Sequence, residues 1–337
     1  MKIITAGGIA FLLTIFLICV FRPILVKAKL GQKILDIGPS WHKCKEGTPM
    51  MGGVFFGFSI LLATALVLLK DILSGTQTKL IICMLLALAH ASIGFIDDYI
   101  KMFKKRNKGL SVIGKLLLQF LVTAGFLLAM NLYGFITTEL YIPVIDIFVD
   151  LGIMYYIFMM LIIVYIVNCA NLTDGIDGLA GSISLIIMVM FMLLGLNIDS
   201  IKTISESVIA TNEGTLILAG SIIGALIGFL IFNFHPAKII MGDTGSFFLG
   251  AMVVGMTFMF DMPLLIIPLA FIYIIEGISD VLQVLSYKLT GKRIFKMAPI
   301  HHHFEKCGWS EVKIVGVFTF ITALFCALSY FIYIRSY

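Results

Sequence analysis

Charged side chains are scarce in this chain of 337 residues. Asp, Glu, Lys and Arg together make up 13% of the sequence, whereas soluble domains carry about 25%. Apolar residues make up 60%, and the mean hydropathy is +1.09. This balance excludes an ordinary soluble domain and predicts an all-α polytopic membrane protein.

Motifs that would assign other classes of protein are missing. The six cysteines show neither CxxC pairs nor zinc-type spacing, so we expect no disulfide and no structural zinc. A GxxxxGK[ST] loop is absent, which argues against an ATP-driven pump. Basic runs lack interleaved aromatic residues, so nucleic acid is not an expected partner. The chain shows no internal repeat, and an inverted-repeat transporter therefore has no support.

Apolar runs long enough to cross a bilayer, which takes about 20 residues, occur repeatedly. They predict ten transmembrane helices in a single integral membrane domain over 1–337, at 3–22, 50–69, 79–96, 112–130, 152–170, 178–196, 215–233, 244–260, 263–286 and 313–334. The first run has no basic start beyond Lys2 and no obvious small-residue cleavage site, so we interpret it as a retained span. The connection 131–150 has a strand-prone composition and predicts a small hairpin on the outer face.

Lysine and arginine are distributed unevenly between the two sides of this arrangement. The segments that follow spans one, three, seven and nine carry 19 of the 24 basic residues. The positive-inside rule places these segments in the cytoplasm and both termini outside. The excess positive charge behind the formal net charge of +5 therefore lies on the expected cytoplasmic side, where it would attract an anionic lipid or substrate.

Two adjacent carboxylates, Asp97 and Asp98, end an apolar run that starts near Leu80. Placing ionisable groups at membrane depth costs free energy, so such groups suggest a functional site. Neighbouring helix residues point about 100° apart, so the two side chains need separate contacts, and at least one should face a polar cavity. The alternative is a pair of boundary charges balanced by the basic residues that follow. In a functional site, two close carboxylates would attract a divalent cation.

Residues 168–181 form the densest polar cluster of the chain. Asn168 and Asn171 are three residues apart, as are Asp174 and Asp177, so each pair can share a helix face. The glycines between them permit a tight reversal with backbone groups free for a ligand. A plain turn would explain Asp-Gly but not four acid or amide side chains. The ligand spacing of a calcium loop is absent.

The segment 233–246 places Asp243 at the expected start of span eight. A helix N-terminus presents free N–H groups that bind phosphate oxygens, and an Asp there is also a common cap. Capping alone does not require the nearby Asn233 and the flanking glycines. This segment therefore favours a phosphate site.

Two more connections on the same side carry phosphate-binding residue types. Lys43 and Thr48 precede the second span and are placed to contact phosphate, although a helix start with small packing residues is the simpler explanation of that loop. His301, His302 and His303 lie near Lys and Arg residues. Consecutive histidines rarely share one metal because their side chains diverge, so we expect donors to a phosphate or diphosphate rather than a metal site.

The acids at 97, 98, 174, 177 and 243 thus converge with cationic and amide donors on one membrane face. Such a collection suits magnesium-assisted phosphoryl transfer between a water-soluble diphosphate and a lipid phosphate. Carboxylates hold the metal, and the metal with Lys or His neutralises the developing charge.

Five segments resemble the motifs of a known family, in the family's order: 48–53, 97–101, 168–179, 233–246 and 297–303. The family is the phospho-N-acetylmuramoyl-pentapeptide-transferases of bacterial peptidoglycan synthesis, within the polyprenyl-phosphate N-acetylhexosamine-1-phosphate transferase superfamily. The resemblance covers essentially the whole chain. The Ala-Pro-Ile-His-His-His loop at 298–303 is similar to this branch in particular.

The resemblance implies ten transmembrane helices, a cytoplasmic active site, a homodimer and a multi-pass protein of the bacterial inner membrane. It also implies the reaction, in which UDP-N-acetylmuramoyl-pentapeptide and undecaprenyl phosphate give lipid I and UMP, with Mg²⁺ as cofactor.

Residue roles follow from the matching motifs. Asp243 would be the principal magnesium ligand, with Asp97 as a second, and Asp97 or Asp98 would deprotonate or orient the lipid phosphate. The implied substrate contacts are Asn171, Asp174 and Asp177 for the nucleoside, Lys43, Thr48, Asn233, His301, His302 and His303 for the diphosphate and sugar, and Lys101 and Lys115 for the anionic groups. Asn168 is a further implied substrate contact.

Two positions depart from the family pattern. Ile240 stands where an aromatic residue would stack on uracil, and Asp280 stands where an apolar residue is expected. Two rival functions also stay open. One is transfer of another sugar phosphate, such as N-acetylglucosamine 1-phosphate, from its UDP form to a polyprenyl phosphate, and the other is a lipid or sugar transporter.

Overall fold

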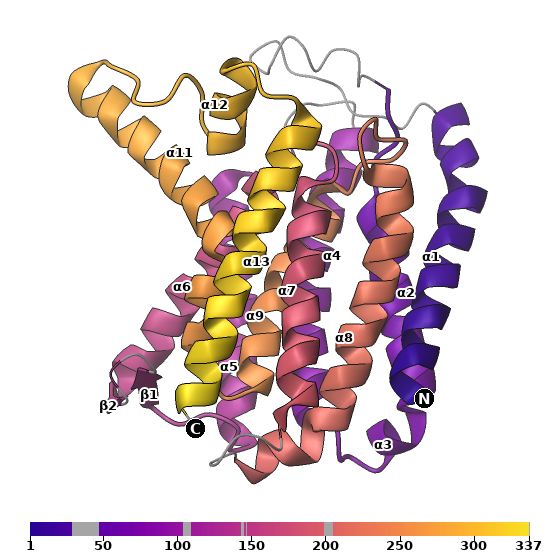
Figure 1. Ribbon diagram of the computed structural model, residues 1–337, viewed down its shortest axis with the longest axis vertical. Coiled ribbons are helices and arrows are strands. Elements are labelled where there is room, and N and C mark those ends of the chain that lie inside the picture. The colour runs from indigo at the N-terminus through magenta and orange to yellow at the C-terminus, as the bar shows by residue number, and fades with distance from the viewer. Residues whose placement is uncertain (29–46, 104–108, 143–144, 146, 199–204, 337) are drawn as a thin grey trace.

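The computed structural model describes residues 1–28, 47–103, 109–142, 145, 147–198 and 205–336. Within them the chain is helical apart from one two-stranded hairpin (Figure 1). The elements in chain order are α1 (Lys2–Lys27), α2 (Gly52–Val67), α3 (Leu69–Leu73), α4 (Thr78–Phe103), α5 (Val112–Leu132), β1 (Glu139–Ile142), β2 (Ile147–Asp150), α6 (Ile153–Thr173), α7 (Leu179–Leu196), α8 (Glu206–Asn233), α9 (Gly242–Met259), η3 (Pro263–Leu265), α10 (Ile266–Leu269), α11 (Phe271–Thr290), α12 (Ile300–Lys306) and α13 (Glu311–Ser336).

Seven of the described helices are long and apolar enough to cross a membrane: α1, α4, α5, α6, α7, α8 and α13. The bent pair formed by Pro263–Leu269 and Phe271–Thr290 makes an eighth if it is one span. Helix α2, with 16 residues, and helix α9, with 18, occupy the other two expected positions. The prediction of an all-α polytopic membrane protein is confirmed, and the count of ten stays a prediction.

Helix α9 lies at the centre of the bundle (Figure 1). Every residue of this helix except Asp243 is buried, and it packs against α4, α6 and α2. The neighbouring backbones approach its first turn very closely. A Cβ atom on Gly53 of α2 would lie 2.2 Å from the amide nitrogen of Gly245, and one on Gly94 of α4 would lie 2.3 Å from the carbonyl oxygen of Asp243. The beginning of α9 is therefore enclosed by two other helices.

Two helices begin elsewhere than the apolar runs predicted. Helix α8 starts at Glu206 rather than at 215, because Ser205 caps it by accepting a hydrogen bond from the Val208 amide. Helix α2 starts at Gly52, since the residues before it pair with another segment. The Ile240 amide donates to the Pro49 carbonyl, and the Gly52 amide donates to the Ile240 carbonyl.

The ninth expected span, 263–286, is not one straight helix. It consists of η3 and α10, followed after Ala270 by α11, with a bend of 76° between the two parts. Pro263 and Pro268 both lie in this run, and a proline removes a backbone donor and crowds the preceding turn. Beyond the bend, α11 leans away from the bundle (Figure 1).

The two ends of the bundle differ in character (Figure 1). The α12 end carries α12 and the outer part of α11, and the hairpin end carries β1, β2, α3 and both chain termini. Helix α4 runs from the hairpin end to the α12 end, and α9 runs back. Both termini therefore lie at the same end of the bundle, and their placement outside the membrane stays a prediction.

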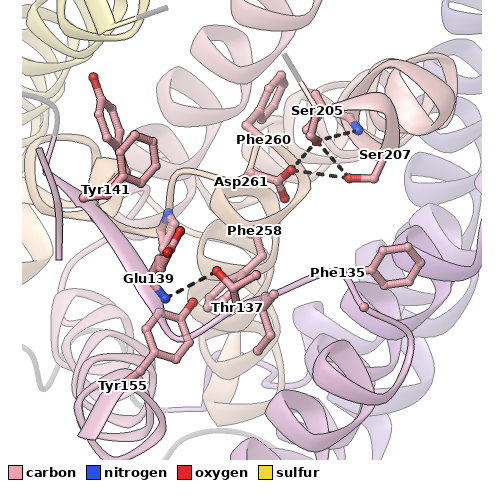
Figure 2. A pocket seen from close by; sticks show the side chains of 15 residues that line it. Phe135, Thr137, Glu139, Tyr141, Tyr155, Ser205, Ser207, Phe258, Phe260 and Asp261 are labelled. Carbon is pink, nitrogen blue, oxygen red and sulfur yellow. Dashed lines mark hydrogen bonds between the residues drawn. The ribbon is translucent and has the colours of Figure 1, made fainter. Parts of the chain in front are cut away.

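The hairpin predicted within 131–150 is confirmed, because β1 pairs antiparallel with β2 and sets Tyr141 opposite Phe148. Beside it lies a cavity of about 400 Å³ with aromatic walls that include Phe135 and Phe258. Asp261 lines the same cavity, where it accepts hydrogen bonds from the hydroxyls of Ser205 and Ser207 (Figure 2).

The cysteines within the described residues, Cys19, Cys83, Cys169, Cys307 and Cys326, are all free thiols. Cys44 lies outside the described residues.

Candidate active site

Asp243 lies in the first turn of α9, and 16% of its side chain is exposed. Its Oδ2 atom is 3.0 Å from the Nζ atom of Lys101 and 3.0 Å from that of Lys115. Its Oδ1 atom accepts a hydrogen bond of 3.0 Å from the side-chain amide of Asn171. One carboxylate thus joins α4, α5 and α6 at the N-terminus of α9.

Asp97 shares both of these lysines and is fully buried. Its Oδ2 atom lies 2.7 Å from the Nζ atom of Lys101 and 3.0 Å from that of Lys115. Its Oδ1 atom accepts a 2.6 Å hydrogen bond from the Leu110 amide. Two carboxylates and two ammonium groups therefore balance one another, and the ammonium groups occupy the space between the acids.

Asp98 points to a different place, as the 100° separation of helix neighbours predicted. Its Oδ1 atom accepts from the Asp243 amide at 3.1 Å, and its Oδ2 atom accepts from the Thr244 amide at 2.9 Å and from the Thr244 hydroxyl at 2.7 Å. The Asp98 side chain is completely buried. Both of its oxygens are thus engaged by the first turn of α9. Neither Asp97 nor Asp98 is exposed, so the expectation that at least one would face an open polar cavity is not met in this arrangement.

The polar cluster at 168–181 extends this site from α6. The Asn171 amide also donates to the Ser246 hydroxyl at 2.9 Å, which fixes its orientation toward Asp243. Asp174 follows the end of α6 and is partly exposed, yet its carboxyl group lies among protein atoms and other acids. Burial, followed by the negative charges of Asp243 and Asp98, raises the pKa of Asp174 well above its ordinary value of 3.8.

Asp177 belongs to a second cluster, with His235 and Glu311. Its Oδ2 atom lies 3.2 Å from His235 Nδ1 and accepts a 2.9 Å hydrogen bond from the Ala237 amide. The Glu311 carboxylate accepts from the Asp177 amide at 3.0 Å. The three side chains each offer one ligand atom, and these atoms lie within 4.8 Å of one another, so the cluster could hold a metal ion.

The other predicted residues on the polar loops mainly hold backbone or neighbouring helices. Asn233 accepts from the Gly178 amide at 3.2 Å and donates to the Ile239 carbonyl at 2.9 Å, which ties α7 to the loop before α9. Asn168 donates to Gln119 at 2.8 Å between α6 and α5. Thr48 is partly exposed beside the paired segment at 49–53. Lys43 lies outside the described residues.

The three histidines of α12 have three different environments. His301 is fully buried, with Nδ1 3.1 Å from Glu276 Oε2, and a Cβ atom on Gly175 would lie 2.2 Å from its Nε2 atom. His302 Nδ1 is 2.6 Å from Glu305, and His303 Nδ1 accepts from the Lys296 amide at 3.1 Å. His301 therefore supports the 174–177 loop from behind, whereas His303 lies nearer the surface.

Several site residues were not singled out from the sequence. Thr244 and Ser246 contact Asp98 and Asn171, but hydroxyl residues in a helix start give no specific signal. Glu276 and Glu311 do give a sequence signal, because each is a carboxylate inside or next to an apolar run. An ionisable residue in such a position suggests a functional site.

The acids at this centre are of the type that binds magnesium, although in this arrangement the ammonium groups of Lys101 and Lys115 lie on the Oδ2 atoms of Asp97 and Asp243. Carboxylate oxygens are the ligands that Mg²⁺ prefers, and Asp97 and Asp243 offer them. Asp97 Oδ2 is also a buried oxygen without a well-aligned hydrogen bond, although both ammonium groups are close. The mixed nitrogen and oxygen donors of the Asp177 cluster suit zinc better than magnesium.

Comparison with known proteins places the chain in a family. The model of glycosyl transferase family 4 matches residues 80–261. Three curated relatives carry the name phospho-N-acetylmuramoyl-pentapeptide-transferase. The protein of Clostridioides difficile is 42% identical over 95% of this chain and 94% of its own length. That of Clostridium beijerinckii is 40% identical over 98% and 96%, and that of Caldicellulosiruptor bescii is 39% identical over 95% and 94%. This chain is therefore a member of glycosyl transferase family 4 and, within it, belongs to the phospho-N-acetylmuramoyl-pentapeptide-transferases.

Proposed function

We propose that this protein transfers phospho-N-acetylmuramoyl-pentapeptide from its UDP form to undecaprenyl phosphate, giving lipid I and UMP for peptidoglycan synthesis. The observation that carries the proposal is the meeting of Asp97, Asp243, Lys101 and Lys115 at the N-terminus of α9. The ammonium groups bind the phosphates of both substrates, and carboxylates bind a metal.

In the transfer, a bond forms between an oxygen of the lipid phosphate and the sugar-linked phosphorus. The bond from that phosphorus to the bridging oxygen breaks, and UMP leaves. Asp97 orients the lipid phosphate or takes its proton, as proposed from the motif. The ammonium groups of Lys101 and Lys115 bind the phosphate oxygens and hold the negative charge that develops.

Asp243 and Asp97 would hold Mg²⁺, which supplies Lewis-acid neutralisation of phosphate charge. Asn171 keeps Asp243 oriented by its hydrogen bond to Oδ1. The cluster of Asp177, His235 and Glu311 is the alternative cation site. It is less suited to Mg²⁺, because it includes an imidazole.

The remaining predicted residues would contact the other parts of the two substrates. Asp174 and Asp177 would contact the nucleoside, with Lys43, Thr48, Asn168, Asn233, His302 and His303 around the diphosphate and sugar. His301, buried behind Gly175, would act through the loop that it supports. Ile240, in place of an aromatic residue, leaves Phe234 as a ring on the same loop, and 43% of Phe234 is exposed.

The protein would work as one integral domain, 1–337, in the bacterial inner membrane. We propose ten spans, with the α12 end on the cytoplasmic face and both termini outside. The basic residues after spans one, three, seven and nine support this orientation. A homodimer is part of the same proposal.

The test is release of UMP by the purified protein in detergent, with undecaprenyl phosphate and each UDP-sugar in turn. We expect UMP from UDP-N-acetylmuramoyl-pentapeptide and none from UDP-N-acetylglucosamine. The reverse preference would assign the related sugar-phosphate transfer. No UMP from either substrate would overturn the transferase proposal and favour the transporter. Release of UMP in detergent, where no membrane gradient exists, would exclude the transporter.

Substitution of Asp243 makes the same assay specific for the site. Asp243→Ala is expected to lower turnover by orders of magnitude while leaving the protein folded. Asp150→Asn, at the hairpin end, is the matched control and should keep full activity. Turnover of Asp243→Ala within a few-fold of the parent would refute the assigned role.

A further inference from the structure

We propose that Asp98 is a positioning residue rather than a catalytic one, because its carboxylate caps the first turn of α9 and thereby places Asp243. Asp98 accepts three hydrogen bonds from Asp243 and Thr244, and none of its side chain is exposed. A group that contacts substrate needs an accessible oxygen, and both Asp98 oxygens face α9. For Asp98 to bind a lipid phosphate, α9 would have to lose its cap.

Helix α9 does not supply a cap from its own sequence. Met241, the residue before the helix, makes no capping hydrogen bond with its side chain. The acid in its first turn, Asp243, directs its carboxylate to Lys101, Lys115 and Asn171 instead. The free amides at a helix start need acceptors, and the helix dipole favours a negative charge there. Asp98, from α4, meets both needs.

The local backbone is built for this contact. Gly242 has a positive φ of 78°, and a Cβ atom on it would lie 2.8 Å from Asp98 Oδ2. Gly94, one turn before Asp98 on α4, lets α4 and α9 approach closely. A Cβ atom at this position would lie only 2.3 Å from the Asp243 carbonyl oxygen. These two positions bring the carboxylate within hydrogen-bond distance of the helix start.

Helix α4 also supplies a charged side chain at the other end of α9, its C-terminus. The buried ammonium group of Lys79, on α4, donates to the Met259 carbonyl at 3.4 Å and forms an ion pair with Asp261 just beyond α9. A positive charge at a helix C-terminus complements the dipole. Helix α4 thus supplies an acid at the start of α9 and a base at its end, which fixes the position of Asp243 along the helix axis.

A variant that leaves Asp98 intact distinguishes positioning from catalysis. Thr244→Val removes only the hydroxyl that donates to Asp98, whereas Thr244→Ser keeps it. Thr257→Val is the matched control, since Thr257 is a buried threonine of α9 whose hydroxyl donates to Val254. The full-length protein in detergent is compared with these variants and with Asp98→Asn.

Two measurements need no substrate. The first is Mn²⁺ affinity by electron paramagnetic resonance, and the second is hydrogen exchange of the amides in 242–246. Positioning predicts roughly 10- to 100-fold weaker Mn²⁺ binding for Asp98→Asn and a smaller loss for Thr244→Val. Both variants should exchange faster in 242–246, and Thr244→Ser and Thr257→Val should match the parent in both measurements.

A third measurement is UMP release, in which Thr244→Val should lose turnover together with metal affinity and Thr244→Ser should recover both. The proposal is overturned if Asp98→Asn abolishes turnover while Asp98→Asn and Thr244→Val keep parental Mn²⁺ affinity and exchange. This inference rests on the proposed cation site at Asp243. A parent protein that releases no UMP would defeat the proposed function, whereas the exchange of 242–246 would still decide the role of Asp98.

Discussion

The imidazole of His301 lies against the carboxylate of Glu276, with Nδ1 3.1 Å from Oε2, and neither side chain is exposed. The pair joins α12 to α11 beyond the bend of that helix. His301 Nε2 and Glu276 Oε1 have no hydrogen-bond partner among the described residues. Each member of the pair is therefore a buried polar group that has the other as its partner.

Removing one member of this pair should be costly. Glu276→Ala leaves the buried His301 ring without its polar partner, and leaving a buried polar group unsatisfied costs about 1–3 kcal/mol of unfolding free energy. We expect a lower melting temperature in detergent and a smaller loss for Glu276→Gln, which keeps an acceptor for Nδ1. Glu139→Ala, at an exposed hairpin position, is the control. Equal melting temperatures for Glu276→Ala and the control would show that the pair contributes nothing.

Close packing of α2 on α9 gives a second prediction. Gly53→Ala places a Cβ atom 2.2 Å from the Gly245 amide, so the helices must separate. Overpacking of this kind costs about 1–3 kcal/mol. Gly57→Ala on the same helix places its Cβ 3.9 Å from the Phe248 ring, which is an ordinary contact. Thermal unfolding should show a loss for Gly53→Ala and none for Gly57→Ala, and the idea fails if the two variants melt together.

Chelation tests the cation at Asp243. EDTA should abolish UMP release, and added Mg²⁺ should restore it, because carboxylates and two lysines alone do not neutralise both substrates. Asp177→Asn separates the two candidate cation sites in the same titration. If the ion binds at Asp243 and Asp97, this variant should need the same Mg²⁺ concentration as the parent for half-maximal activity. Activity that ignores EDTA would contradict metal assistance.

The pH dependence of stability gives a prediction for Asp174. Its pKa in the folded protein is raised by burial and by neighbouring acids, so the neutral form favours folding. This contribution is fully present below the ordinary pKa of 3.8 and is lost as the pH rises through the raised value. Asp174→Asn should therefore melt higher than the parent at pH 8 and should differ least at low pH.

The pKa of Asp150 is shifted in the opposite direction from that of Asp174, so its pH dependence should have the opposite sign. Hydrogen bonds from the Thr138 hydroxyl and the Gly152 amide lower the pKa of Asp150. Its contribution is present above the ordinary pKa and is lost as the pH falls, so Asp150→Asn should not raise the melting temperature at pH 8. Melting curves of the two variants across pH 4 to 9 check both signs, and a lower melting temperature of Asp174→Asn at pH 8 would contradict the first.

Much of the fold was predictable because the membrane imposes length and hydropathy on its helices. The expected run 152–170 became α6 (Ile153–Thr173), and 178–196 became α7 (Leu179–Leu196). Residues 206–214 of α8 were missed because this turn is polar, and hydropathy does not register a helix that continues into water. The bend after Ala270 was missed because two prolines in an apolar run do not specify whether a helix ends or turns.

The site was predictable in composition but not in its contacts. Adjacent acids on a helix must diverge, and Asp97 and Asp98 do so. That Asp98 would face the amides of another helix depends on tertiary packing, which no local pattern encodes. The burial of His301 has the same origin, since three consecutive histidines look equivalent until Glu276 and Gly175 are placed around the first.

The enclosure of α9 has a consequence for how the protein is made. A segment that begins with an acid and two glycines is a poor candidate to enter lipid alone, because each charge costs free energy there. Its partners α2, α4, α6 and α7 all come earlier in the chain, so they are already in the bilayer when α9 emerges from the ribosome. We therefore expect α9 to enter the bilayer after its partners, and a fragment that begins at Gly242 to integrate only when the preceding helices are supplied alongside it.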